Sequence, residues 1–178
     1  MTDHLNYLLD SISHVQNEAN AIINNNKTSS NDNVLLESKT LIFSNAMKCA
    51  REGNLIQLIR HLDYYKSLYS KDFDMNQRQL HGNGRTLLQE ASMHGNVECV
   101  DWILTRDNLN VNRMSLVGKE TALHYACFNN HLSVVLSLLH HGANPNQRNK
   151  RNFTVFEYCK SEPIMNSLLS FSKSLIEM

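Results

Sequence analysis

Apolar residues recur at helical spacing in two short runs within residues 121–146. The first run lies within residues 123–127 and the second within 134–139, and Asn129-Asn130 interrupts the pattern between them. Gly142 follows the second run, where a helix end favours a residue with positive φ. The pattern predicts a helix-turn-helix hairpin with one apolar face. Because such a hairpin is too small to bury that face alone, we expect copies of it to stack side by side.

The chain contains four such copies. Each begins with a hydroxyl residue and has a small residue five positions later, and the small residues are separated by 42, 35 and 33 positions. The hydroxyl residues are Ser44, Thr86, Thr121 and Thr154, and the small residues are Cys49, Ala91, Ala126 and Cys159.

The third copy, with TALHYA from Thr121 and ANPN after Gly142, closely resembles an ankyrin repeat, whose period is about 33 residues and whose signature is T-P-L-H-x-A. The second copy resembles it with Leu87 and Gln89 at the Pro and His positions. The first and fourth are degenerate, as terminal repeats that expose a polar face are expected to be. The resemblance implies an all-α solenoid of helix-turn-helix units with hairpin fingers, with repeats at about 44–75, 76–110, 111–144 and 145–172.

Residues 1–33 form a separate region before the repeat domain, which we place at 34–178. Residues 3–23 carry an apolar stripe at helical spacing, and residues 24–33 are a polar, Asn- and Ser-rich linker. Two interpretations of the helix remain open. It folds back and covers the first repeat, or it binds a partner or a second copy.

The interior of the stack is predicted from equivalent positions of successive repeats. The threonines that open the inner helices can cap free backbone N–H groups. The small residues five positions later let adjacent helices approach closely, and Trp102 is predicted to lie between neighbouring repeats. The first outer helix, at about 55–69, is longer than a standard one. The other predicted core residues are Leu88, Leu123 and Phe156.

The fingers are predicted from turn residues at 73–85, 110–120 and 145–153. Gly82 and Gly84 supply the positive φ angles of a tight hairpin in the first finger, and Gly118 lies in the second. In the third, Asn152 stands where the turn normally has glycine, and asparagine tolerates that conformation better than other side chains.

Composition limits the cell compartment and the class of partner. The formal net charge is zero and the pI is about 7.1, so no global attraction to nucleic acid or membrane is implied. The four cysteines lie one per repeat without a C-x-x-C pair, which indicates packing residues in a reducing compartment. No signal peptide and no apolar run near 20 residues are visible. We therefore expect a cytoplasmic or nuclear protein.

Catalytic and metal-binding motifs are not apparent, so we expect no enzyme and no cofactor. The sequence has no glycine-rich phosphate loop, no G-x-S-x-G and no H-E-x-x-H. The best metal candidate is His124, Cys127 and His131, spaced for one helical face. The resemblance instead gives His124 a structural role, in which its ring bonds the turn of its own repeat and the next.

The resemblance implies a partner-binding surface made of the finger tips and the outward face of the inner helices. Tyr125, Phe128 and Tyr158 are candidate anchors there, although Phe128 could equally fill space between repeats. With Lys48 at an equivalent position of the first repeat, the predicted inner-helix contacts are Glu90, Met93, His94, Tyr125, Phe128, Asn129 and Tyr158.

The fingers carry seven positive charges against two acidic residues, Asp74 and Glu120. The positive residues are Arg78, Arg85, Arg113, Lys119, Arg148, Lys150 and Arg151. A basic ridge beside aromatic residues suggests a protein partner with an acidic surface. The alternative is a solvated edge that keeps the fingers soluble, and nucleic acid is a weaker candidate. We thus expect a protein-interaction module acting as inhibitor, adaptor or regulator; the rival is a subunit that docks into a larger complex through its N-terminal helix.

Overall fold

The computed structural model describes residues 31–79 and 82–176, and side chains within 39–173. The chain divides into two compact units, Met1–Ile42 and Phe43–Met178, and the second contains the repeats. The described residues form seven α-helices and one 3₁₀ turn, without a strand. The elements are α2 (Asn31–Glu52), α3 (Leu55–Tyr69), α4 (Leu87–Met93), α5 (Val97–Leu104), α6 (Ala122–Phe128), α7 (Leu132–His140), η1 (Val155–Glu157) and α8 (Glu162–Ile176).

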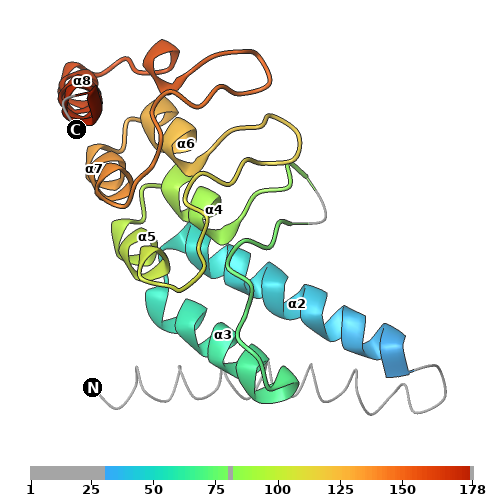
Figure 1. The fold of residues 1–178 in the computed structure, drawn as a ribbon. Helices are drawn as coiled ribbons and strands as arrows, with labels where there is room; N and C mark the ends of the chain where they lie inside the picture. Colours follow the sequence, from blue (N-terminus) through green and yellow to red (C-terminus); the bar gives the residue numbers. More distant parts are fainter. Residues whose placement is uncertain (1–30, 80–81, 177–178) are drawn as a thin grey trace. The chain divides into compact units, whose positions relative to one another are not determined.

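Within the second unit, helix pairs stack in the order of the chain (Figure 1). The inner row contains α4, α6 and η1, and the outer row contains α5, α7 and α8. Each inner helix contacts the outer helix of its own repeat and the inner element of the next. The loops between repeats project to one side as the predicted fingers. The predicted solenoid of helix-turn-helix units is confirmed.

The core consists of apolar and small residues at equivalent positions of the repeats. Leu88 and Leu123 are 2% and 1% exposed, and Ala91 and Ala126 are fully buried. Because alanine has the shortest side chain with a Cβ, helices α4 and α6 can pack closely at these positions. The core positions predicted for repeats two and three are therefore confirmed.

Capping boxes begin the inner helices. The Thr86 hydroxyl accepts a hydrogen bond from the Gln89 backbone N–H, and the Gln89 side chain accepts one from the Thr86 backbone N–H. Thr121 and His124 form the same pair at the start of α6. In the fourth repeat, Glu157 accepts a hydrogen bond from Thr154. The hydroxyls thus satisfy N–H groups that have no partner within the helix, as predicted for Thr86 and Thr121.

The residue three positions after the capping threonine also joins each repeat to the next finger. The amide of Gln89 donates to the backbone oxygens of Arg113 and Glu120, at 2.6 and 3.1 Å. His124 Nε2 donates to the Phe153 oxygen at 3.2 Å. The structural role expected for His124 is confirmed, and glutamine performs the same function one repeat earlier.

The fingers are hairpins held to one another through the backbone. The Ser115 N–H bonds the Glu120 oxygen within the second finger, at 2.9 Å. Between fingers, the Leu116 N–H bonds the Gly84 oxygen at 3.2 Å. Gly84 has a φ of +62°, and a Cβ there would lie 2.5 Å from the Leu116 side chain, so glycine is required both by conformation and by space. Asn152 has a φ of +65°, as predicted.

A repeated Asx turn links the bases of the fingers. It occurs at residues 74–76, 110–112 and 144–146, where the first side chain accepts a hydrogen bond from the backbone N–H two residues later. The Asn76 side chain then accepts from the N–H of residue 110, and the Asn112 side chain from that of residue 144, both at 2.7 Å. Successive repeats are therefore fixed in register by side-chain amides.

The fourth repeat departs from the prediction. Its inner helix is a single 3₁₀ turn, η1, and Phe156 and Cys159 are only half-buried. No further repeat covers this side among the described residues, so these two positions are not enclosed as Leu123 and Ala126 are. Its outer helix α8 is anchored by Ile164 and Leu168, both fully buried.

The N-terminal helix predicted at 3–23 and most of its linker lie outside the described residues. In the described part of the chain, no helix has both the length and the apolar character needed to cross a lipid bilayer.

Candidate functional site

The outward sides of the inner helices and the adjoining fingers form one surface, which we call the groove face. It carries two rows of side chains. One row lies four residues after the hydroxyl that opens each repeat, and the other seven residues after it. The first row is Lys48, Glu90, Tyr125 and Tyr158, and the second is Arg51, Met93 and Phe128.

A cleft of about 230 Å³ opens on the groove face between the second and fourth repeats. It brings together half of the residues predicted to bind a partner, from two inner helices and the residue that follows one of them, from two fingers, and from the residue that follows η1. These are Arg85, Met93, Tyr125, Phe128, Asn129, Arg151 and Tyr158, joined by Asn83, Glu120 and His124. The other predicted residues, Arg78, Glu90, His94, Arg113, Lys119, Arg148 and Lys150, do not line it.

Tyr158 is the centre of the aromatic wall of the cleft. Its ring meets that of Phe128 edge-to-face, with centroids 5.8 Å apart. Its hydroxyl accepts hydrogen bonds from Asn149 at 2.6 Å and Arg151 at 2.7 Å, and it donates to Glu120 at 3.3 Å. Polar side chains of two fingers thus fix the ring, so that its position does not depend on η1 alone.

The exposure of the three predicted aromatic anchors differs widely. Phe128 is 60% exposed, so it does not serve mainly to fill space between repeats. Tyr158 is half-buried, whereas Tyr125 is only 8% exposed. The expectation that Tyr125 is a partly exposed anchor is therefore wrong: it lines the cleft as a buried side chain, and burial raises the pKa of its hydroxyl. The Arg85 guanidinium lies 5.7 Å from the Tyr125 ring centroid.

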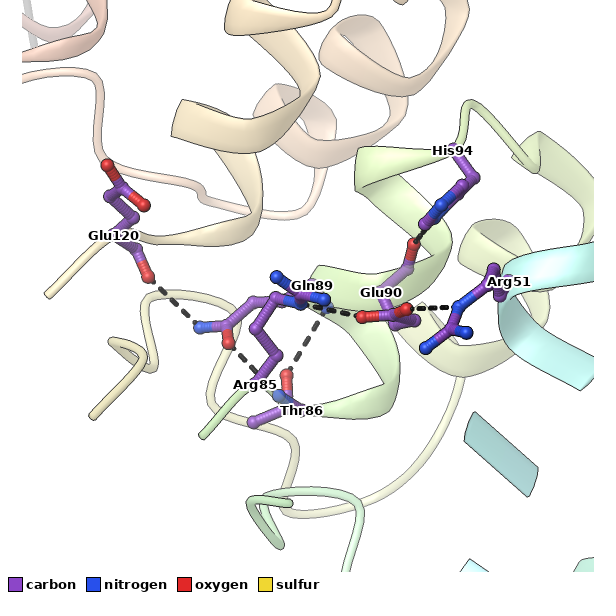
Figure 2. A network of polar contacts seen from close by, with 7 residues as sticks. All are labelled: Arg51, Arg85, Thr86, Gln89, Glu90, His94 and Glu120. Atoms are coloured by element: carbon purple, nitrogen blue, oxygen red, sulfur yellow. Dashed lines mark hydrogen bonds and ion pairs between the residues drawn. The ribbon is translucent and has the colours of Figure 1, made fainter. Parts of the chain in front are cut away.

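Glu90 was predicted as an exposed contact, and this is wrong because its side chain is fully buried. Figure 2 shows its carboxylate between two arginines. Arg51 Nε donates to one oxygen at 2.7 Å and Arg85 Nε to the other at 2.6 Å. Burial raises the pKa of the Glu90 carboxyl, but the hydrogen bonds and charges of the two arginines outweigh it and hold that pKa below its ordinary value.

The basic side chains of the fingers fall into two groups. Lys119, Arg148, Lys150 and Arg151 are exposed. Arg78, Arg85 and Arg113 are half-buried, and Arg85 is engaged by Glu90. The exposed positive charge of the fingers is therefore concentrated on the second and third fingers, and of these four side chains Arg151 lines the cleft.

Arg51 is the groove-face residue that the sequence analysis missed. It lies seven residues after Ser44, the position that Met93 and Phe128 occupy in the next two repeats. The repeat register was the signal that could have found it. The degenerate first repeat obscured that signal, because Lys48 alone was carried over from it.

Of the three residues considered for a metal site, the two histidines have structural partners instead and the cysteine is buried. His124 Nδ1 accepts from the Thr121 N–H at 3.3 Å while Nε2 bonds the next finger. His131 Nε2 donates to the Met93 backbone oxygen at 3.2 Å. This gives a hydrogen-bond partner to a carbonyl group at the end of the preceding inner helix. Burial raises the pKa of the Cys127 thiol to about 12, which disfavours the thiolate that a metal requires.

A larger hollow, of about 670 Å³, lies away from this cleft between α3 and α5. It contains four aspartates, Lys66, Arg106 and Trp102 among its walls. Trp102, predicted to lie between repeats, is half-exposed there, and the Arg106 guanidinium lies 4.3 Å from its ring centroid. Because Lys66 and Arg106 already engage Asp72 and Trp102, we regard the aromatic cleft as the better candidate site.

Comparison with known proteins agrees with the repeat architecture. No curated protein sequence matches the chain significantly. The family model described as ankyrin repeats, in three copies, matches residues 46–149, which is 104 of the 178 residues. The stacked helix pairs, the threonine caps and this match lead to the same conclusion: the chain belongs to the ankyrin repeat family.

Proposed function

We propose that this protein binds a partner protein through the groove face. Phe128 and Tyr158 are the apolar anchors, and the exposed cations of the fingers supply positive charge around them. Ankyrin repeats are in general protein–protein interaction modules. The observation that carries the proposal is Phe128, a large apolar side chain 60% exposed at the cleft and packed against Tyr158. Exposed aromatic residues beside a pocket are typical anchors of interfaces.

The charge around the cleft supports an acidic partner surface. Lys119, Lys150 and Arg151 are exposed on the fingers that border it, while Glu120 is partly covered and bonded to Tyr158. Complementary charge of this kind accelerates encounter and selects among partners. We therefore propose a role as inhibitor, adaptor or regulator of a protein with an acidic face, rather than as an enzyme.

The test compares the wild-type protein with Phe128→Ala. Affinity capture and mass spectrometry identify binders, and each binder is then purified and its Kd measured by calorimetry. Removing an anchor at a cleft is expected to weaken binding by about 2 kcal/mol, or roughly 30-fold. Leu169→Ala is the matched control, since Leu169 is 46% exposed on α8. A purified partner that binds Phe128→Ala as tightly as wild type would contradict the proposal.

Two further measurements separate the alternatives. The first is deletion of residues 1–33. If this deletion abolishes binding while Phe128→Ala binds the partner as tightly as wild type, the result would instead favour a subunit that docks through its N-terminal region. Salt dependence separates protein from nucleic acid, because a nucleic-acid ligand releases counterions and its affinity falls steeply with added salt. A protein partner is expected to show a mild dependence.

A further inference from the structure

We propose that Arg51 recognises a carboxylate side chain of the partner, that the positive charge of Arg85 supports this contact, and that buried Glu90 positions Arg51 for it. This inference rests on the proposed function of the groove face and adds a site to it, two repeats before Phe128. Arg51 comes from α2, whereas Arg85 and Glu90 come from the first finger and α4.

The hydrogen bond to Glu90 leaves much of the Arg51 guanidinium unused, whereas the Arg85 side chain is only 15% exposed and its guanidinium also lies over the Tyr125 ring. Both arginines bond the carboxylate through Nε only, at 2.7 and 2.6 Å. Within the described residues, no hydrogen-bond partner occupies the terminal nitrogens of Arg51, and its side chain is 49% exposed. A guanidinium has five N–H donors, so donors remain available for a second carboxylate.

The net charge of the Arg51, Arg85 and Glu90 side chains can be neutralised by one further negative charge. Two guanidinium groups against one carboxylate leave a net charge of +1 at the site. A partner Asp or Glu neutralises this charge, whereas a phosphoryl group of about −2 overcompensates it. The Lys48–Glu52 pair on the same helix is exposed on both sides and adds no net charge. The charge balance therefore favours a carboxylate over a phosphate.

Glu90 acts as a positioning residue. Its side chain is fully buried, and each of its oxygens holds one arginine. An arginine side chain loses considerable rotamer freedom when it binds a ligand. Because Glu90 has already restricted both arginines, less freedom remains to be lost when the partner arrives.

The register of the repeats predicts the spacing of the two contacts on the partner. Arg51 and Phe128 occupy the same position two repeats apart. With about 9 Å between packed helices, they are separated by roughly 18 Å. An extended chain advances about 3.3 Å per residue, so the acidic and apolar residues of a bound segment should lie about five or six positions apart.

The experiment uses the full chain and a phage-displayed library of random 16-residue peptides. We expect the selected peptides to share an Asp or Glu about five or six positions from a large apolar residue. Fluorescence polarisation then measures a selected peptide, its Gln variant and its phosphoserine variant against wild-type protein, Arg51→Gln and Phe128→Ala. Glu90 keeps Arg85 as a partner in Arg51→Gln, and a thermal melt checks the fold. Lys173→Gln removes the same charge from α8 as the control.

We expect either change, Arg51→Gln or peptide Glu→Gln, to weaken binding about tenfold or more, and the two together to weaken it little further, because they remove one contact. Lys173→Gln should have less than a twofold effect. Peptides that need Phe128 but carry no acidic residue, or that bind Arg51→Gln normally, would overturn this inference and leave the proposed function intact. Selected peptides indifferent to Phe128→Ala would overturn the proposed function itself. Tighter binding of the phosphoserine peptide would overturn the carboxylate assignment.

Discussion

Replacement of Glu90 by glutamine tests whether the buried carboxylate stabilises the junction of the first two repeats. The amide has nearly the shape of the carboxylate, so the change removes charge without creating a cavity. Its oxygen can still accept from one arginine, but its NH₂ group faces the donors of the other. The variant therefore loses one charge-assisted hydrogen bond and the attraction to both guanidiniums.

The expected cost follows from the burial of the three side chains. Removing one partner of a buried ion pair costs about 3–5 kcal/mol. The lower end applies here, because the Arg51 side chain is 49% exposed and can turn to water, although that of Arg85 is only 15% exposed. For a chain of this length, about 3 kcal/mol corresponds to a decrease in Tm of roughly 6–12 °C.

The pH dependence supplies a second signature. Since the pKa of Glu90 in the folded protein lies below the ordinary value of 4.5, its ion pairs stabilise the fold above about pH 4.5. That stabilisation is lost as the pH falls through the folded-state pKa. The difference in Tm between wild type and Glu90→Gln should therefore be full at pH 7 and shrink below about pH 4.5.

Thermal and urea denaturation followed by circular dichroism measure both effects. Glu52→Gln is the control, because Glu52 is exposed and its contact with Lys48 is 4.0 Å long. It should change stability by less than about 0.5 kcal/mol. An unchanged Tm for Glu90→Gln at pH 7 would show that the pairs contribute no net stability. A difference that persists undiminished at pH 3 would show that the loss of stability does not come from the ionised carboxylate.

Three further predictions concern the core and its titratable groups. Ala126→Leu should overpack the contact between α4 and α6 and lower the Tm by about 4–8 °C, and an unchanged melt would refute the repeat register. Burial lowers the pKa of His124, so the neutral ring stabilises the fold above about pH 6.5, and this stability is lost on acidification. The variant His124→Gln, which imitates Gln89, should keep the wild-type Tm at pH 7, and its Tm should fall less than that of wild type between pH 7 and pH 5 in the same melts. An equal fall in the Tm of both proteins would refute this. Iodoacetamide at pH 8 should label half-buried Cys159 well before Cys127, as peptide mass spectrometry would show, and the reverse order would contradict the burial pattern.

The repeat architecture could be predicted because its pattern lies in short stretches of the sequence and recurs in each repeat. The threonine, the leucine two positions on and the small residue five positions on recur in register, so weak signals reinforce one another. The caps at Thr86 and Thr121 follow from residue type and position alone.

The candidate site could be predicted only in outline. Glu90 and Phe128 both point from inner helices toward the groove face, yet one is fully buried and the other 60% exposed. The difference comes from Arg51, which lies 39 residues before Glu90, and from Arg85 in the adjacent finger. Periodicity gives the face on which a residue lies, but not which distant side chain will cover it.

The half-burial of Phe156 and Cys159 has a related cause. Their positions in the repeat are core positions, and the pattern alone gives no reason to treat them differently from Leu123 and Ala126. What differs is the absence of a following repeat in the described residues. Burial in a stacked protein depends on the neighbour, so the last unit loses it even when its own sequence is suitable.

The single 3₁₀ turn of the fourth repeat gives the protein an uneven distribution of rigidity. Tyr158 directly follows η1, and its hydroxyl is fixed by side chains of the fingers rather than by a full helix of its own. Local opening at this end should therefore require less free energy than at α4 or α6. A partner that clamps Tyr158 would slow amide exchange most strongly in residues 149–159. Occupancy of the cleft would thus be measurable as slower amide exchange in the backbone of the last repeat.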